Sequence, residues 1–120
     1  MAYEVNFTDE FEDWWDGLTV EQQEDVDARV RLLESHGPTL GRPTVDRIEG
    51  SAYHNMKELR CSSDGALRVL FAFDPRRQAI LLLGGDKSGQ WDDWYRDAIP
   101  RADQLHRQYL QNLREEGEIE

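Results

Sequence analysis

The sequence predicts an α+β fold, in which a small, mainly antiparallel sheet packs against an N-terminal helical hairpin and a C-terminal helix. Residues 51–90 indicate three consecutive strands joined by tight turns, and helical patterns flank them on both sides. The same segment holds 6 Lys/Arg and 4 Asp/Glu, whereas residues 1–50 hold 4 and 13 and residues 91–120 hold 4 and 8. The predicted strands are therefore a basic island in a chain of net charge −11.

The N-terminal segment predicts a short strand followed by a helix. Tyr3, Val5 and Phe7 alternate with polar residues, which is typical of a strand. Thr8 is a candidate N-cap, because two acidic residues follow it in the first turn, where the helix dipole favours them. Four apolar residues then share one helical face: Phe11, Trp14, Trp15 and Leu18.

A second helix is expected almost immediately. Thr19 and Gln22 have the spacing of a capping box. The buried stripe of this helix is expected to be Val26, Val30 and Leu33. Gly37-Pro38 marks its end. Since almost no chain separates the two helices, they are expected to form a hairpin that packs on the sheet.

The central strands follow a segment, residues 37–50, that is rich in Gly and Pro and is predicted to be a loop. Strands are predicted near Tyr53–Arg60, over Leu67–Asp74 and over Gln78–Leu83. The last of these is nearly all apolar, so it should be central and covered on both faces.

The C-terminal third predicts a helix. Gly84-Gly85 should end the preceding strand, and the helix should be kinked or restarted at Pro100. Its apolar face includes Trp91, Trp94, Tyr95 and Ala98. The predicted order is thus β-α-α-β-β-β-α in a single domain over residues 1–120.

Composition limits the classes of protein to which the chain can belong. A length of 120 residues suits one domain, and a single cysteine, Cys61, excludes an intramolecular disulfide. No apolar run approaches the roughly 20 residues needed to cross a bilayer, and the acidic N-terminus is unlike a signal peptide. We expect a cytoplasmic protein with no membrane association. The negative charge argues against non-specific binding to duplex DNA, although the basic island could hold a phosphate that another component delivers.

Three segments resemble the HigB-like, phage-derived branch of the RelE/ParE superfamily of type II toxins. They are residues 55–60 (NMKELR), 68–77 (RVLFAFDPRR) and 83–87 (LGGDK), followed by a helix rich in Trp and Tyr. The stretches GRP at 41–43 and IEGS at 48–51 are also similar to the loop before the core strands in that branch. The resemblance covers nearly the whole chain, and the run from residue 55 to residue 87 is its specific part.

This resemblance implies a toxin that cleaves mRNA in the ribosomal A site without a metal or any other cofactor. It also implies a cognate antitoxin, which we expect to be a small helix-turn-helix protein of the HigA/XRE-like kind. The pair would bind operator DNA through the antitoxin. The ribosome would present the message and supply much of the affinity, so an acidic protein could still act on RNA.

Metal-free RNA cleavage needs groups that stabilise the phosphorane-like transition state, and guanidinium groups bind phosphate in a bidentate manner. Arg60 ends one predicted strand and Arg68 begins the next, so the two should be neighbours across the ladder. Both match superfamily arginines and are candidate catalytic phosphate binders. Lys87 follows the last strand, where the superfamily places a catalytic cation. The structural alternatives are strand-edge arginines, for example paired with Asp64, and a surface lysine paired with Asp86.

The proton acceptor is where the chain departs from the lysine pattern of some relatives. Strand alternation places Met56, Glu58 and Arg60 on one face and Lys57 on the other. Glu58 is therefore the better-placed catalytic base, with His54 in line behind it. Lys57 is structural or contacts RNA from the edge. A glutamate beside arginines is, however, more often an ion-pair partner than a base.

The remaining candidates are RNA contacts. Tyr95 could stack on a base or orient a phosphate, with a place in the core as its alternative, and Arg76 and Arg77 lie in the turn between two strands. His36 and His106 are interpreted as structural, because neither pairs with another ligand at metal spacing, and Cys61 is not a nucleophile candidate, because it lies in a predicted turn without a nearby His motif.

Two other functions stay open at this point. The missing lysine pair and the negative charge, which could mimic nucleic acid, would also suit a non-catalytic inhibitor of a protein target, as in gyrase-poisoning relatives. A third possibility is a regulatory module that only binds an antitoxin. Growth arrest without RNA cleavage would favour the inhibitor, and absence of toxicity would favour the module.

Overall fold

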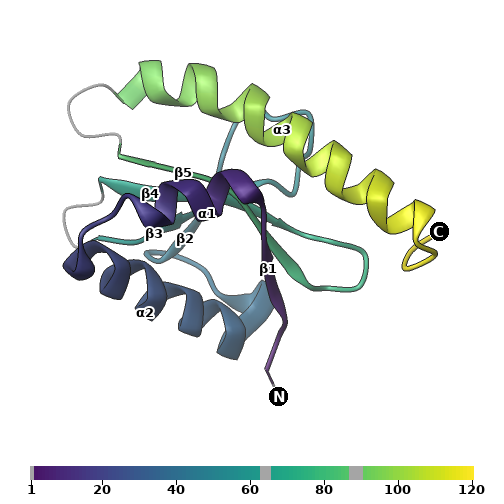
Figure 1. Ribbon diagram of the computed structural model, residues 1–120, viewed down its shortest axis with the longest axis horizontal. Helices are drawn as coiled ribbons and strands as arrows, with labels where there is room; N and C mark the ends of the chain where they lie inside the picture. The colour runs from purple at the N-terminus through teal and green to yellow at the C-terminus, as the bar shows by residue number, and fades with distance from the viewer. Residues whose placement is uncertain (1, 63–65, 87–90) are drawn as a thin grey trace.

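The computed structural model describes residues 2–62, 66–86 and 91–120, with the side chains of residues 91 and 92 excepted. Helices cover both faces of a five-stranded sheet (Figure 1). The elements are β1 Val5–Phe7, α1 Asp9–Asp16, α2 Val20–His36, the short 3-10 helix η1 Gly37–Thr39, β2 Val45–Arg47, β3 Lys57–Arg60, β4 Leu67–Phe73, β5 Ala79–Asp86 and α3 Trp91–Glu115. Among the described helices, none is long and apolar enough to cross a membrane.

The strands lie in the order β1-β5-β4-β3-β2. All neighbours are antiparallel except β1 and β5, which are parallel. The sheet is thus mainly antiparallel and the fold is α+β, as predicted. β1 and β2 lie at opposite edges of the sheet, and α1 and α2 lie between them in the chain.

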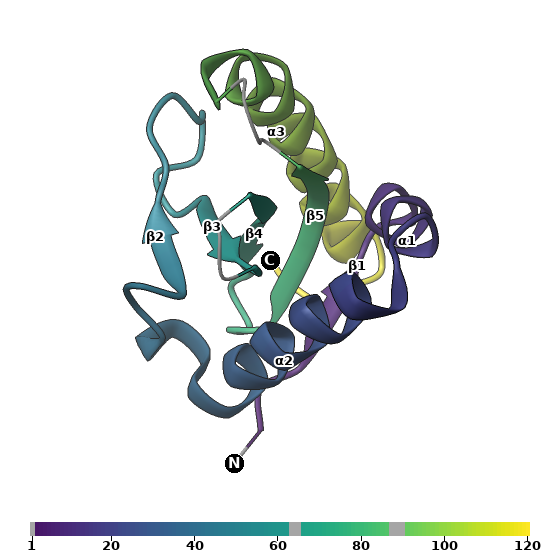
Figure 2. The ribbon, with the colours of Figure 1, turned by 90° about the vertical axis from the view of Figure 1, so that its left-hand side faces the viewer.

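Two apolar cores lie on opposite faces of the sheet. Leu67, Val69 and Phe71 of β4 belong to the core that contains residues of α1 and α2. Leu70 and Ala72, which alternate with them, belong to the core beneath α3. Figure 2 shows α2 and α3 on opposite sides of the strands. β4 and β5 are consequently buried on both faces, which the apolar sequence of residues 78–83 predicted for β5.

The predicted helix starts are confirmed. The Thr8 side chain accepts a hydrogen bond from the Phe11 N–H at 3.1 Å. Thr19 and Gln22 form the reciprocal capping box, with distances of 3.1 and 2.9 Å. α2 ends at His36, directly before Gly37-Pro38. Local sequence signals therefore set the bounds of both helices.

The prediction for residues 37–50 was incomplete, because this segment contains the strand β2, which pairs with β3. Three residues are too few for a period-two pattern to be recognised. The strand predicted from Tyr53 begins only at Lys57, since a turn closes first through a 3.0 Å bond from the Met56 N–H to the Tyr53 carbonyl.

Gly84 and Gly85 do not end β5, contrary to the prediction. A Cβ atom on Gly84 would lie 2.2 Å from the Trp14 ring, and one on Gly85 would lie 2.0 Å from Trp94. The glycines therefore let two indoles pack directly on the strand, one from each face. α3 likewise runs through Pro100 as one helix. Pro100 is exposed, so water can solvate the carbonyl that loses its N–H partner.

Candidate functional site

Arg60 and Arg68 are direct partners in the β3–β4 ladder, as the sequence predicted. Cross-strand partners project to the same face of a sheet. That face is the one beneath α3, because Glu58, two residues before Arg60, meets Tyr95 of α3. The sheet register thus places two guanidinium groups side by side under the N-terminal half of α3.

Glu58 lies between these arginines and is buried, with 4% of its surface exposed. Its Oε2 accepts a bond of 2.5 Å from Arg68 Nη1 and lies 3.5 Å from Arg60 Nε. Its Oε1 accepts a hydrogen bond from the Tyr95 hydroxyl. Both carboxylate oxygens are therefore engaged, which is the arrangement of an ion-pair partner; a proton acceptor would first have to release Arg68 or Tyr95.

Asp46 of β2 also belongs to the site, although the sequence analysis missed it. Its Oδ2 lies 3.0 Å from Arg60 Nη2, and its Oδ1 lies 2.9 Å from Nε of Arg42. The hydrogen bond from Arg42 is the largest cause of a lowered pKa at Asp46. One signal for Asp46 was present in the sequence, its spacing of four residues from Arg42 in the predicted loop. Because β2 was not predicted, nothing in the sequence placed Asp46 opposite β3.

The two arginines differ in exposure. The side chain of Arg68 is 5% exposed, whereas that of Arg60 is 34% exposed. Arg60 Nε is buried and makes no hydrogen bond within the described part of the chain. Because a third of its side chain is exposed, Arg60 can meet a ligand from solvent, while Arg68 lies beneath the surface and stabilises the charge of Glu58.

A cavity of about 380 Å³ opens beside Glu58 and Tyr95. Its other lining residues are Arg47, Ile48, Glu49 and Ile99. Burial, with the hydrogen bond and charge of Glu58 next, raises the pKa of Tyr95. The phenol therefore keeps its proton at physiological pH and acts as a hydrogen-bond donor to Glu58. Tyr95 also packs against Trp94, with ring centroids 5.1 Å apart, so it combines the predicted core position with a place at the site.

Other predicted residues lie elsewhere. Lys57 is on the opposite face of the sheet, with its Nζ 5.9 Å from the centre of the Phe73 ring. His54 is exposed in the turn before β3, so the prediction that it continues the line of Glu58 was wrong. The physical reason is that period-two alternation ends where the strand ends. Lys87 lies outside the described residues.

Arg76 and Arg77 are in the β4–β5 turn, at the other end of β4 from Arg68. Arg76 Nη2 lies 3.0 Å from Asp74 Oδ2, and Nη1 lies 3.4 Å from Glu118. Arg77 is exposed and has a positive φ of 64°. The structure therefore does not bring these two arginines to the Arg60–Arg68 pair. No group of three His, Cys, Asp or Glu residues that could hold a metal occurs in the described ranges.

Comparisons with known proteins identify the family of the chain. Residues 13–107 match the family "Phage derived protein Gp49-like (DUF891)". The chain is 52% identical over 99 residues to "Putative toxin HigB3" of Mycobacterium tuberculosis, covering 82% of this chain and 86% of that protein. It is 48% identical over 99 residues to "Putative toxin HigB2" of the same organism, covering 81% of this chain but 49% of HigB2.

Solved structures show the same fold at low sequence identity. One chain of the archaeal RelE–RelB complex from Pyrococcus horikoshii OT3 superposes with a TM-score of 0.59 at 14% identity, over 74% of this chain and 99% of that one. The chain therefore belongs to the phage-derived Gp49-like family and is a HigB-like toxin with the RelE fold.

Proposed function

We propose that this HigB-like toxin is a ribosome-dependent mRNA endoribonuclease of a type II toxin–antitoxin pair. The observation that supports the proposal best is the cross-strand pair of Arg60 and Arg68 beneath α3. Two guanidinium groups on one face can bind the non-bridging oxygens of a scissile phosphate and stabilise the charge that develops on them.

The two arginines would share this work unequally. Arg60 is the more exposed of the two, so it would meet the phosphate first. In doing so it would exchange Asp46 for a phosphate oxygen. Arg68 would act from below, where Glu58 holds its guanidinium until the phosphate binds. Lys87, which follows Asp86 in the sequence, remains our candidate for the cation that stabilises the transition state or protonates the leaving 5′-oxygen.

Proton transfer would involve Glu58 and Tyr95. The 2′-hydroxyl of the substrate must lose a proton as it attacks phosphorus, and the leaving 5′-oxygen must gain one. When a phosphate draws the arginines away from Glu58, that carboxylate becomes available as the base. Tyr95, whose raised pKa keeps it protonated, would then orient Glu58 through their hydrogen bond.

The charge of the chain supports a substrate that is delivered rather than captured. A net charge of −11 repels free RNA over distances up to the Debye length, about 8 Å at physiological ionic strength. On the ribosome, contacts elsewhere would supply the affinity. We therefore place the protein in the cytoplasm with mRNA and ribosome as partners. Its antitoxin would be a helix-turn-helix protein through which the pair binds its operator.

The test is inducible expression of this chain alone, with primer extension on a translated message. Wild type should give cuts that disappear when translation is blocked. Arg60→Ala should reduce cleavage by about 10²–10³-fold, the usual loss when one transition-state donor is removed. The matched control is Arg42→Ala, because Arg42 binds the same Asp46 but its side chain is 79% exposed, and cleavage should be unchanged.

Three results would contradict the proposal. Cleavage that persists in a folded Arg60→Ala variant would remove the arginine pair from the chemistry. Growth arrest without cuts would point to inhibition of a protein target. Neither arrest nor cuts would leave a module whose role lies with its antitoxin. Thermal unfolding of each variant, measured by circular dichroism, separates loss of function from loss of fold.

A further inference from the structure

The outer edge of β1 carries the second feature of this molecule that could bind a partner. β1 is the last strand of the sheet, with β5 on one side. The Ala79 N–H donates to the Glu4 carbonyl at 2.9 Å, and the Thr8 N–H donates to the Leu81 carbonyl at 3.1 Å. Because backbone groups alternate along a strand, those of Val5 and Phe7 point away from β5, toward the outside of the sheet.

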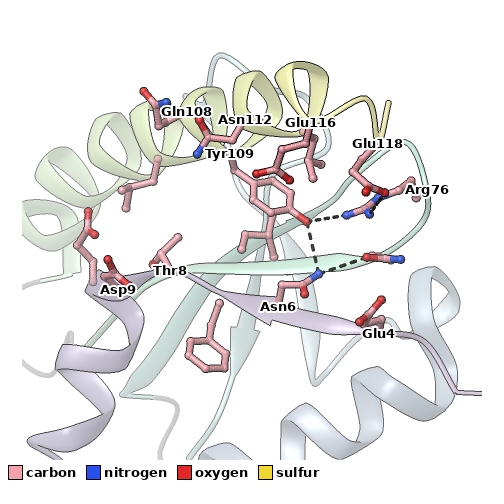
Figure 3. Close-up of a pocket in the computed structure, with 16 residues that line it drawn as sticks. Glu4, Asn6, Thr8, Asp9, Arg76, Gln108, Tyr109, Asn112, Glu116 and Glu118 are labelled. Carbon is pink, nitrogen blue, oxygen red and sulfur yellow. Dashed lines mark hydrogen bonds and ion pairs between the residues drawn. The ribbon is translucent and has the colours of Figure 1, made fainter. Parts of the chain in front are cut away.

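One groove lies on the α3 side of this edge. It has a volume of about 560 Å³ and lies between β1 and the C-terminal half of α3 (Figure 3). Asn6 of β1 and Thr8, the N-cap of α1, line it on one side, and Leu105 and Tyr109 line it from α3. Five acidic residues also line it: Glu4, Asp9, Glu10, Glu116 and Glu118.

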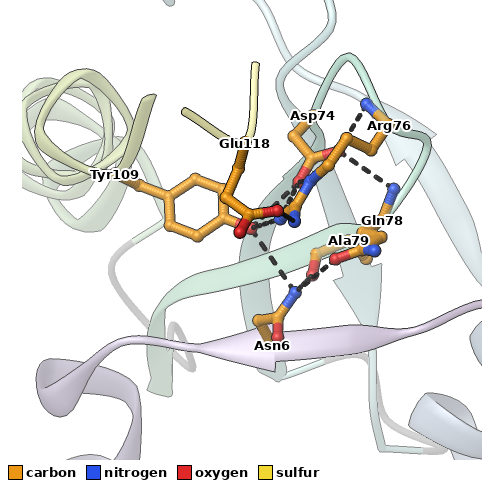
Figure 4. Close-up of polar contacts among 7 residues, drawn as sticks. All are labelled: Asn6, Asp74, Arg76, Gln78, Ala79, Tyr109 and Glu118. Carbon is orange, nitrogen blue, oxygen red and sulfur yellow. Dashed lines mark hydrogen bonds and ion pairs between the residues drawn. The ribbon is translucent and has the colours of Figure 1, made fainter. Parts of the chain in front are cut away.

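The floor of this groove is fixed by a hydrogen-bond network (Figure 4). The Tyr109 hydroxyl donates to Asp74 Oδ2 at 2.9 Å, and Asn6 Nδ2 donates to Tyr109 at 3.4 Å. Arg76, the one cation among the lining residues, is bound to Asp74 and Glu118. Its charge is therefore already matched, and the described structure gives Glu4, Asp9 and Glu116 no cationic partner.

A second groove lies on the opposite face of the same edge. It has a volume of about 310 Å³, and its floor is apolar, formed by Val5, Phe7, Phe11, Trp15, Val30 and Leu81. Acidic residues line it as well: Glu12, Asp16, Asp27 and Glu34. Phe7 lines both grooves and is 54% exposed, which is unusual for a phenylalanine.

We propose that the β1 edge binds an extended segment of a partner protein in which basic and apolar residues alternate. A strand added beside β1 would pair with the outward N–H and C=O groups of Val5 and Phe7. Its side chains would then point alternately to the two faces of the sheet. Lys or Arg side chains would enter the acidic groove under α3, and apolar side chains would cover Phe7 in the other groove.

Charge decides between this occupant and a second copy of the chain. Two copies joined along β1 would bring the acidic rims of both grooves against each other, and each chain carries a net charge of −11. A basic segment neutralises the same rims. The inference does not depend on ribonuclease activity: three strand spacings, about 14 Å, separate β1 from β3, so such a segment would leave the Arg60–Arg68 pair uncovered.

The test uses the full chain and a labelled synthetic peptide of about eight residues that alternates Lys and Val. The control peptide has the same composition arranged as Lys-Lys-Val-Val. We expect the alternating peptide to bind at least about tenfold more tightly by fluorescence anisotropy. Hydrogen exchange of the Val5 and Phe7 amides should slow in the complex. Equal binding of both peptides, or unchanged exchange at these amides, would overturn the proposal, because either result means non-specific attraction to an acidic protein.

Variants locate the binding on the protein. Phe7→Ser and the double variant Glu4→Gln/Glu116→Gln should each weaken the alternating peptide about tenfold or more. Val20→Ser, at another exposed apolar residue, and Glu21→Gln/Glu24→Gln, at exposed acids of α2, should not. Loss of affinity in the control variants, or a wild-type dimer in sedimentation that Phe7→Ser abolishes, would overturn the assignment.

Discussion

Two clusters beneath α3 contain the same residue types but are built differently. In one, Glu58 binds Arg68 and the hydroxyl of Tyr95. In the other, Asp74 binds Arg76 and the hydroxyl of Tyr109. The two tyrosines are fourteen residues apart on one helix, which corresponds to roughly 21 Å. The two clusters therefore link α3 to the sheet at two well-separated points along the helix.

The difference lies in the sequence separation of the partners. Asp74 also accepts the backbone N–H groups of Arg76 and Gln78, at 2.8 and 3.1 Å, so most of its partners lie within four residues. The two closest partners of Glu58 lie on a neighbouring strand and on α3. The Asp74 cluster fixes a turn, whereas the Glu58 cluster holds two cations from different strands, of which Arg60 is open to solvent. The surroundings of an arginine therefore decide whether it is structural or available to a ligand. The residue type alone does not decide this.

Loss of Arg68 should have the largest effect. Arg68→Ala leaves Glu58 buried without its closest cation, and breaking a buried ion pair in this way costs about 3–5 kcal/mol. Urea unfolding would measure it. The double variant Arg68→Met/Glu58→Leu should recover most of the stability but no RNA cleavage. If the double variant is as unstable as the single one, the loss comes from packing and not from the unpaired charge.

Removal of the other carboxylate comes next. Asp74→Ala should lower the free energy of unfolding by about 2–4 kcal/mol, because Arg76, Tyr109 and two backbone N–H groups lose their acceptor. Cleavage per folded molecule should remain, since this cluster lies at the far end of β4. A loss of cleavage without a change in stability would show that the Asp74 cluster takes part in catalysis and is not only structural.

The tyrosine pair gives a smaller and sharper contrast. Tyr95→Phe and Tyr109→Phe each remove one hydroxyl from a carboxylate and should each cost about 1 kcal/mol of stability. Only Tyr95→Phe should also slow RNA cleavage, because only Tyr95 touches Glu58. Single-turnover cleavage on programmed ribosomes would measure this, and equal rates for the two variants would contradict the contrast.

The smallest effect is on the pH dependence of stability. Burial, with the bond to Asp74 next, raises the pKa of Tyr109 to about 12, above the value of 10.0 for an unperturbed tyrosine. The contribution of the Tyr109 hydroxyl to the free energy of unfolding is complete below pH 10. It is lost as the pH rises toward 12, because Tyr109 ionises at a lower pH in the unfolded chain than in the folded one. Thermal unfolding across this range should show a shallower decline in Tyr109→Phe. If stability declines equally in the wild type and in Tyr109→Phe, the pH dependence comes from other titratable groups.

Several features were predictable because the signal lies within a few residues. Thr8 and Thr19 marked the helix starts by capping chemistry, and apolar runs marked β4 and β5. The period of two placed Glu58 and Arg60 on one face and Lys57 on the other. A short turn made Arg60 and Arg68 neighbours. The fold class, the arginine pair and the family resemblance were therefore determined by the sequence itself.

Tertiary structure alone decided the rest. β2 has too few residues for a pattern and exists because β3 supplies its partners, so Asp46 could not be placed at the site from sequence. Gly84 and Gly85 suggested the end of a strand, but two indoles approaching from opposite faces require them within it. β1 pairs with β5, more than seventy residues away, which leaves its outer edge open. In each case contacts between residues distant in sequence outweigh the local preference. Local sequence patterns carry no information about those contacts.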